Sequence, residues 1–147
     1  IVYSENYKYV IGKSIKLVDG EDISIIATGP MVHVVLDVAV LLQAANISTA
    51  VYNMHTIKPI DVSTIDIVSK TSKLVVTVEE HTRIGGLGSA VLEHCSDEMP
   101  EQTGKIFRIG LPDNFADKYG NQNALWDHFG ITVESLCDAM KKKIKKS

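Results

Sequence analysis

The sequence contains little cysteine and no long hydrophobic run, and both absences exclude classes of protein. Its two cysteines, Cys95 and Cys137, form no CxxC or Cys/His pattern of the kind that binds zinc. Both fall at apolar positions of predicted helices, so we interpret them as reduced core residues. No apolar run approaches the roughly 20 residues of a membrane-spanning helix, and the N-terminal residues lack the pattern of a signal peptide. We therefore expect a cytoplasmic protein without a membrane partner.

The sequence also lacks an excess of positive charge. Its 15 lysine and arginine residues are outnumbered by 18 aspartate and glutamate residues, giving a formal net charge of −3. General nucleic-acid binding calls for a concentrated basic surface, so we expect no nucleic-acid partner. One basic cluster comprises Lys141, Lys142, Lys143, Lys145 and Lys146. Because it falls where a final helix would end, interaction with the helix dipole is favoured over a ligand patch.

What the chain does have is the size and composition of one globular domain. Its 147 residues are 45% hydrophobic and 22% charged, close to the averages for folded proteins. A domain of this size buries roughly 68–70% of the surface that its unfolded chain exposes, so neither a disulfide nor a metal is needed to hold it. The sequence begins at Ile1 without a methionine, and we interpret it as a piece of a longer polypeptide or a processed one.

Strand and helix patterns alternate along the chain. Short apolar, β-branched runs predict strands at 14–18, 22–29, 47–56, 73–80 and 105–110. Helical patterns follow at 31–46, from Asp61 to about Ser72, from Gly88 or Ser89 to before Pro100, over 123–129, and from Thr132 onward. The Asp19-Gly20 turn predicts a hairpin between the first two strands. The alternation predicts an α/β fold in three layers, α/β/α, around a mainly parallel sheet.

The helix predicted at 31–46 is apolar on nearly all sides. Its polar side chains are limited to His33, Asp37, Gln43 and Asn46, which leaves only a narrow stripe for water. Such a helix is normally buried on more than one face. We expect one face to lie on the sheet and part of the rest to pack against another domain or subunit. The alternative is a helix fully covered within this domain.

The stretch "VVTVEEHTRIGGLGSAV" (75–91) carries the residues that most resemble a site: Glu79, Glu80, His81, Gly85, Gly86, Gly88 and Ser89. It lies at the carboxyl end of a predicted strand, where ligands bind in α/β sheets. However, it lacks the third glycine of a dinucleotide fingerprint and the GK[ST] of a Walker A loop.

The chemistry of this stretch also speaks against catalysis. Adjacent residues of a strand point to opposite faces, so Glu79 and Glu80 are not a facing acid/base pair. His81 has no serine or cysteine nucleophile in a recognised elbow. We expect one carboxylate to face a helix N-terminus or a basic partner. We interpret the stretch as a strand-to-helix turn and an interface element; a turn that binds a small anion or nucleotide is the alternative.

The other histidines and aromatic residues give weaker indications. His55 follows a predicted strand and is interpreted as a hydrogen-bonded structural residue. His94 and His128 lie on helices without the partners that a metal would need. Trp126, with Leu125 and Phe129, is interpreted as core or interface packing.

Several long segments, in order and with the right spacing, carry a family resemblance. They are "YKYVIGKSIKLVDGEDISIIATG", "MHTIKPID", "LVVTVEEHTRIGGLGSAV" and "RIGLPDNFAD". Together they closely resemble the C-terminal domain of the transketolase family, and most of all the kind split into two bacterial or archaeal subunits. "GLPDNFADKYG" is also similar to the deoxyxylulose-phosphate synthases, and the beta subunits of 2-oxoacid dehydrogenases carry the same domain. Both remain alternatives.

The resemblance implies a five-stranded mixed sheet, mostly parallel, with one antiparallel edge strand at 14–18. It implies that 1–13 is a lead from a preceding pyrimidine-binding domain and that 14–147 is the C-terminal domain. It further implies a dimeric enzyme of the pentose phosphate pathway type, dependent on thiamine diphosphate and Mg²⁺, that transfers a two-carbon ketol unit between sugar phosphates.

In that family other domains hold the cofactor. The GDG…N metal motif and the pyrimidine-domain glutamate are missing from this sequence. We therefore assign no catalytic, cofactor-binding or metal-binding residue and expect this chain to bind no cofactor by itself. Its expected partners are the other transketolase domains or subunit, its expected role is assembly or regulation, and alone it is expected to be inactive.

Overall fold

The alternation of strands and helices predicted from the sequence is present in the structure, a computed structural model that describes residues 8–114 and 120–146. Of the predicted lead, residues 1–7 lie outside the described residues. In chain order the elements are β1 (Ile15–Val18), β2 (Ile23–Ala27), α1 (Met31–Ala44), β3 (Thr49–Asn53), α2 (Val62–Thr71), β4 (Leu74–Thr82), α3 (Leu87–Glu98), the 3-10 helix η1 (Pro100–Lys105), β5 (Ile106–Leu111), α4 (Gln122–His128) and α5 (Val133–Ile144).

The sheet has five strands in the order β1-β3-β2-β4-β5. Strands β3, β2, β4 and β5 are parallel to their neighbours, and β1 pairs antiparallel with β3 at one edge. The expected mixed sheet, with an antiparallel edge strand near 14–18, is therefore confirmed.

The hairpin predicted between 14–18 and 22–29 is wrong. Both edges of β2 are occupied by parallel partners, β3 and β4, so β1 pairs with β3 instead. The connection from β1 passes over the start of β3 at Gly20. A Cβ at this position would lie 2.2 Å from the carbonyl carbon of Thr49, so only glycine fits this close approach.

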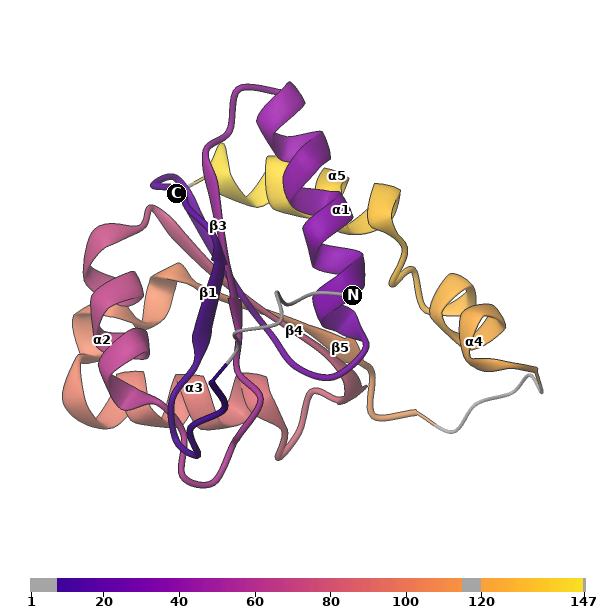
Figure 1. Ribbon diagram of the computed structural model, residues 1–147. Coiled ribbons are helices and arrows are strands. Elements are labelled where there is room, and N and C mark those ends of the chain that lie inside the picture. The colour runs from indigo at the N-terminus through magenta and orange to yellow at the C-terminus, as the bar shows by residue number, and fades with distance from the viewer. Residues whose placement is uncertain (1–7, 115–119, 147) are drawn as a thin grey trace.

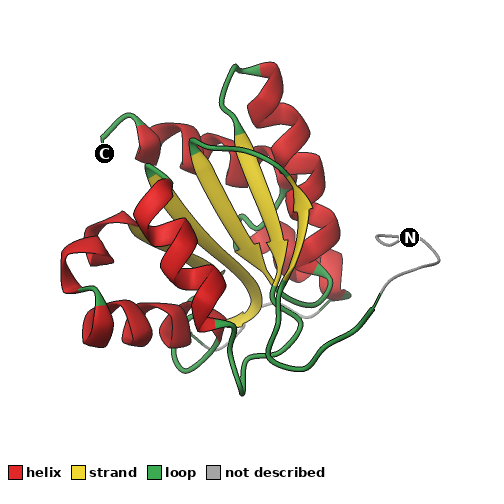
Figure 2. Cartoon of the chain, turned by 60° about the vertical axis from the view of Figure 1, so that its left-hand side comes forward, coloured by secondary structure: helices red, strands yellow, loops and turns green. Residues whose placement is uncertain are grey.

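Helices cover both faces of the sheet, which confirms the three-layer arrangement. Figure 1 shows the sheet between α1 and α5 on one side and α2 and α3 on the other, and Figure 2 shows the strands running side by side between these layers. Each interface has its own apolar cluster. One contains Ile25, Val35 and Met140, and the other contains Ile26, Ile65 and Val91. None of the helices in the described ranges is long and apolar enough to cross a bilayer.

Local capping explains where several helices begin and end. Asp61 caps α2 and accepts a hydrogen bond from the Thr64 amide, and Thr132 caps α5 in the same way. Both starts were predicted. Gly130 follows α4 with a φ of 67°, as expected of a residue that ends a helix. Strand β4 is longer than predicted, reaching Thr82, and α3 begins at Leu87, just before the predicted start.

Helix α1 is buried against the sheet but not on all sides. Val35 is fully buried, whereas Val40 and Leu41 are 67% and 40% exposed. An apolar surface therefore remains on the C-terminal half of this helix. Cys95 on α3 and Cys137 on α5 are free and buried, which confirms their interpretation as core residues. Burial raises the pKa of the Cys95 thiol above its ordinary value.

Candidate functional site at the carboxyl ends of the strands

The carboxyl ends of β2 and β4 form the place where a ligand is expected in this type of sheet. The two strands are neighbours, yet the chain leaves β2 toward α1 on one face and leaves β4 toward α3 on the other. Such a reversal opens a crevice beyond the strand ends. The candidate residues of 79–89 follow β4 into this region, so their contacts decide what the crevice can do.

Glu79 caps helix α3 from within the sheet. Its side chain is fully buried, and its two carboxylate oxygens accept hydrogen bonds of 2.8 Å from the backbone amides of Leu87 and Gly88. A negative group at this end also interacts favourably with the helix dipole. The expectation that one carboxylate faces a helix N-terminus is thus confirmed.

Gly86 makes room for this capping carboxylate. A Cβ at residue 86 would lie 1.8 Å from Oε2 of Glu79, which leaves no space for any side chain. The first-turn amides of α3 are consequently already paired. An anion or phosphate could reach them only by displacing Glu79, so this helix N-terminus is not an open anion site.

Glu80 points to the other face and contacts α4. Its Oε2 accepts a hydrogen bond of 2.5 Å from Nε2 of Gln122, in the first turn of that helix. The other oxygen, Oε1, lies 3.7 Å from where a Cβ of Gly29 would be, so Glu80 stands beside the turn that follows β2. The two glutamates thus serve different contacts on opposite faces, as predicted, and do not form a chelating pair for a Mg²⁺–diphosphate group. The residues present here do not fit that cofactor.

The glycine-rich loop after β4 is closed by Ser89. Its hydroxyl donates to the carbonyl of Arg83 at 2.9 Å and accepts from the amide of Gly85 at 3.0 Å. Arg108 of β5 adds hydrogen bonds from Nη1 to the same hydroxyl and the same carbonyl, both at 3.2 Å. His81 is exposed, and among the described residues its ring has no hydrogen-bonded serine or cysteine. The loop is internally braced, and Arg108, which the sequence did not single out, is one of its braces.

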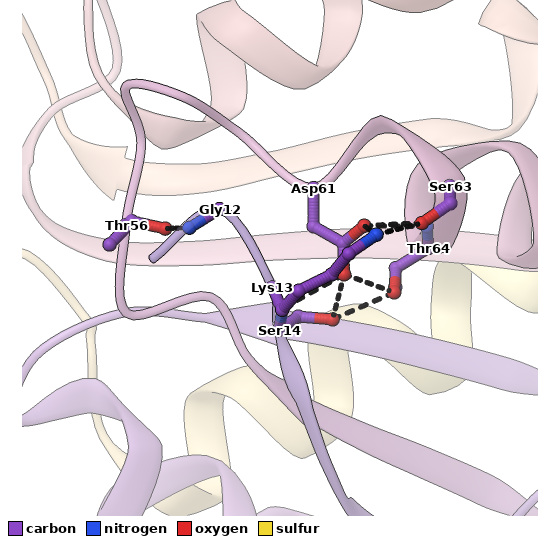
Figure 3. Close-up of polar contacts among 7 residues, drawn as sticks. All are labelled: Gly12, Lys13, Ser14, Thr56, Asp61, Ser63 and Thr64. Carbon is purple, nitrogen blue, oxygen red and sulfur yellow. Dashed lines mark hydrogen bonds and ion pairs between the residues drawn. The ribbon is translucent and has the colours of Figure 1, made fainter. Parts of the chain in front are cut away.

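A second polar cluster lies at the same edge of the sheet, where Asp61 joins the segment before β1 to helix α2 (Figure 3). Asp61 is 4% exposed. Its Oδ2 accepts hydrogen bonds from the amide of Ser14 at 2.8 Å and from the hydroxyls of Ser14 and Thr64 at 3.0 and 2.9 Å. Its Oδ1 accepts from the hydroxyl of Ser63 at 2.5 Å and lies 3.6 Å from Nζ of Lys13.

These contacts control the ionisation of Asp61. Burial acts to raise its pKa, but the hydrogen bonds from Ser63, Ser14 and Thr64 outweigh that effect and hold the pKa well below its usual range. The sequence predicted only the helix cap. The additional partners come from residues nearly 50 positions earlier, 47 in the case of Ser14, and no local pattern indicates them.

The remaining histidines and aromatic residues have structural contacts. The ring of His55 packs against Tyr9 at a centroid distance of 4.4 Å, and its ring nitrogens have no hydrogen-bond partner among the described residues, so the hydrogen-bonded interpretation is wrong there. His94 contacts Oδ1 of Asp66 at 2.7 Å and His128 packs edge-on against Phe129.

Packing also accounts for the aromatic residues of α4. Trp126 and Phe129 lie against the cluster beneath α1, which confirms their interpretation as packing residues. Within the described ranges no group of three or more His, Cys, Asp or Glu side chains is placed to hold a metal ion.

Comparisons with known proteins give the family. The model of the family described as "Transketolase, C-terminal domain" matches residues 12–136. One of the two subunits of the apulose-4-phosphate transketolase of Phocaeicola vulgatus is 34% identical over 143 residues, which are 97% of this chain and 44% of that protein. A 1-deoxy-D-xylulose-5-phosphate synthase of Caldanaerobacter subterraneus subsp. tengcongensis is 33% identical over 97% of this chain and 22% of that protein.

A solved structure agrees in fold and in sequence. It is described as a split gene transketolase, an inactive beta4 tetramer, and it superposes with a TM-score of 0.87 and 33% identity over 99% of this chain and 46% of that one. The chain thus spans less than half the length of these relatives. By the extent of the family match and the level of identity, the chain belongs to the transketolase C-terminal domain family.

Proposed function

We propose that this chain is the C-terminal domain of a cytoplasmic transketolase, that it serves assembly or regulation of that enzyme, and that it has no catalytic activity alone. In the complete enzyme a two-carbon ketol unit passes between sugar phosphates, and thiamine diphosphate with Mg²⁺ supplies the carbanion chemistry. The residues that hold this cofactor belong to other domains or to another subunit. The C-terminal domain supplies a rigid neighbour for them.

The observation that carries this proposal is the internal use of the polar groups beyond the strand ends. Glu79 is bound to the first turn of α3 and Glu80 to Gln122 of α4. Ser89 and Arg108 brace the connecting loop. A catalytic site needs groups aimed at a substrate, and here they are aimed at the fold itself. The site residues 79–89 are therefore proposed to shape a contact surface.

The apolar side of α1 supports a partner for this domain. Val40 and Leu41 remain exposed on a helix whose opposite side is fully buried, and burying them on association would be favourable. We propose that another transketolase domain or subunit covers this side, and that the complete enzyme is a homodimer. The Phocaeicola vulgatus relative, itself a transketolase subunit, and the tetrameric split gene transketolase support the existence of such partners.

The experiment is a reconstitution assay. The isolated chain is supplied with thiamine diphosphate, Mg²⁺ and ketose and aldose phosphates, first alone and then with the polypeptides encoded beside it. We expect no turnover and no cofactor retention by the chain alone, and turnover when the missing domains are present. Activity or tight cofactor binding by the chain alone would refute the proposal.

A deoxyxylulose-phosphate synthase is the second candidate. It is favoured by a relative of that name whose identity, 33%, nearly equals that of the transketolase relative, 34%. The two differ in the domains that precede this one. Sequencing the gene upstream of Ile1 separates them, because only the matching set of preceding domains reconstitutes the corresponding activity.

A further inference from the structure

A basic cavity lies at the edge of the sheet opposite to the candidate site. Its volume is about 590 Å³, and five of its lining residues are lysines: Lys70, Lys73, Lys105, Lys143 and Lys146. They come from the end of α2, the start of β4, the end of η1 and the end of α5. Figure 1 shows the upper end of α2 near the C-terminal end of α5, although these segments are far apart in the sequence.

The charge around this cavity is strongly unbalanced. Among the described residues that line it there is no aspartate or glutamate. Lys73 is paired with Asp22, at 2.7 Å between Nζ and Oδ1. The protein as a whole carries a net charge of −3, so this concentration of positive charge is local.

Two of the lysines are held in place by the fold. Nζ of Lys105 donates to the carbonyl of Ser69 at 3.2 Å, and Nζ of Lys143 lies 5.7 Å from the centre of the Phe107 ring. The cationic groups are thus partly ordered before any ligand binds, which lowers the entropy cost of binding.

Stabilisation of helix ends explains only part of this arrangement. A lysine in the last turn of a helix interacts favourably with the helix dipole, and this applies to Lys70 and Lys143. It does not explain why lysines from four segments face one cavity, because like charges brought together repel one another. A bound anion would remove that repulsion.

We propose that this cavity binds a small, multiply charged, phosphate-bearing anion. Its volume falls within the range of about 300–1,000 Å³ that is usual for small-molecule sites. Several ammonium groups placed around one space suit a ligand with two or more phosphate groups better than a single carboxylate, since each lysine acts as a separate point charge. Such a ligand would bind independently of the chemistry proposed for the complete enzyme.

The test uses inorganic pyrophosphate and tripolyphosphate as probes, at constant ionic strength, in calorimetry and thermal unfolding of this chain. We expect saturable binding with a rise in the unfolding temperature. The variant K70A/K146A removes two exposed lysines of the cavity and is expected to weaken binding at least about tenfold. The matched control K8A/K58A removes two exposed lysines elsewhere, with the same change in net charge, and is expected to stay within about twofold of wild type.

Amide chemical shifts locate the bound probe. We expect pyrophosphate to shift the amides of Ser72 and Gly104 and to leave those of Gly29 and Gly86, at the opposite edge, unchanged. The proposal is overturned if neither probe binds saturably, if both double variants weaken binding equally, or if the shifts occur at the opposite edge. None of these results bears on the reconstitution assay.

Discussion

Replacing Glu79 by glutamine tests whether this residue holds the strand-to-helix turn together. The change keeps the size of the side chain but removes its charge and one of its two acceptor oxygens. One of the two 2.8 Å hydrogen bonds to Leu87 and Gly88 is lost, and the new amide group faces a backbone N–H that it cannot accept from. A buried hydrogen bond to a charged group contributes about 1.5–3 kcal/mol, and the interaction with the helix dipole adds up to about 1 kcal/mol.

We therefore expect Glu79→Gln to lower the free energy of unfolding by about 2–4 kcal/mol. With a urea dependence of about 2 kcal/mol per molar for a domain of this size, the unfolding midpoint falls by about 1–2 M. Circular dichroism in a urea series measures this shift, and hydrogen exchange shows whether the amides of Leu87 and Gly88 lose protection.

The neighbouring residue supplies the control. Glu80→Gln makes the same chemical change at a partly exposed position whose contact is Gln122, and we expect a loss below about 1 kcal/mol. If the two variants lose equal stability, or if Glu79→Gln unfolds within about 0.5 kcal/mol of wild type, the buried carboxylate does not hold the turn and the reasoning fails.

Three further predictions concern nearby features. Gly86→Ala places a Cβ 1.8 Å from Oε2 of Glu79; it should destabilise about as much as Glu79→Gln, and the double variant should show less than the sum in urea unfolding. The pKa of Asp61 is lower in the folded state than in the unfolded state, so the unfolded state binds more protons at acidic pH and its stabilising contribution is lost as the pH falls below about 4. Asp61→Asn should lower stability at pH 7 by about 2 kcal/mol and show a weaker decline in acid, measured by urea unfolding across pH. Val35→Asp buries a charge in the core and should abolish the folded circular dichroism spectrum, whereas Leu41→Asp, at a 40% exposed position, should retain it; a folded Val35→Asp variant would contradict the burial of that side chain.

Sequence patterns predicted the layers and most elements because apolar periodicity reports directly on which faces are buried. They failed where the partner of a residue is distant in the chain. The Asp19-Gly20 turn is typical of a hairpin, but turn chemistry cannot indicate that β2 is already paired on both sides. The start of α3 was misplaced for a similar reason, since its cap is Glu79 on the preceding strand and its N-cap residue, Gly86, makes no side-chain bond.

The site was predicted in the same uneven way. Strand alternation placed Glu79 and Glu80 on opposite faces correctly, because that depends only on their adjacency. The bracing by Arg108 could not be predicted, since it depends on which strand lies next to β4. The basic cavity is a further example. In the sequence the lysines of α5 stand among themselves, and only the fold brings Lys70 and Lys105 to them.

The cluster around Asp61 also determines how the domain responds to a pulling force. Gly12 is hydrogen-bonded to Thr56, and Ser14 to Asp61, so a load applied through the residues before Gly12 reaches these two bonds before it reaches any strand. Under tension the entrance to α2 should rupture first, and the four parallel strands behind it should stay intact until β1 has peeled from its neighbour.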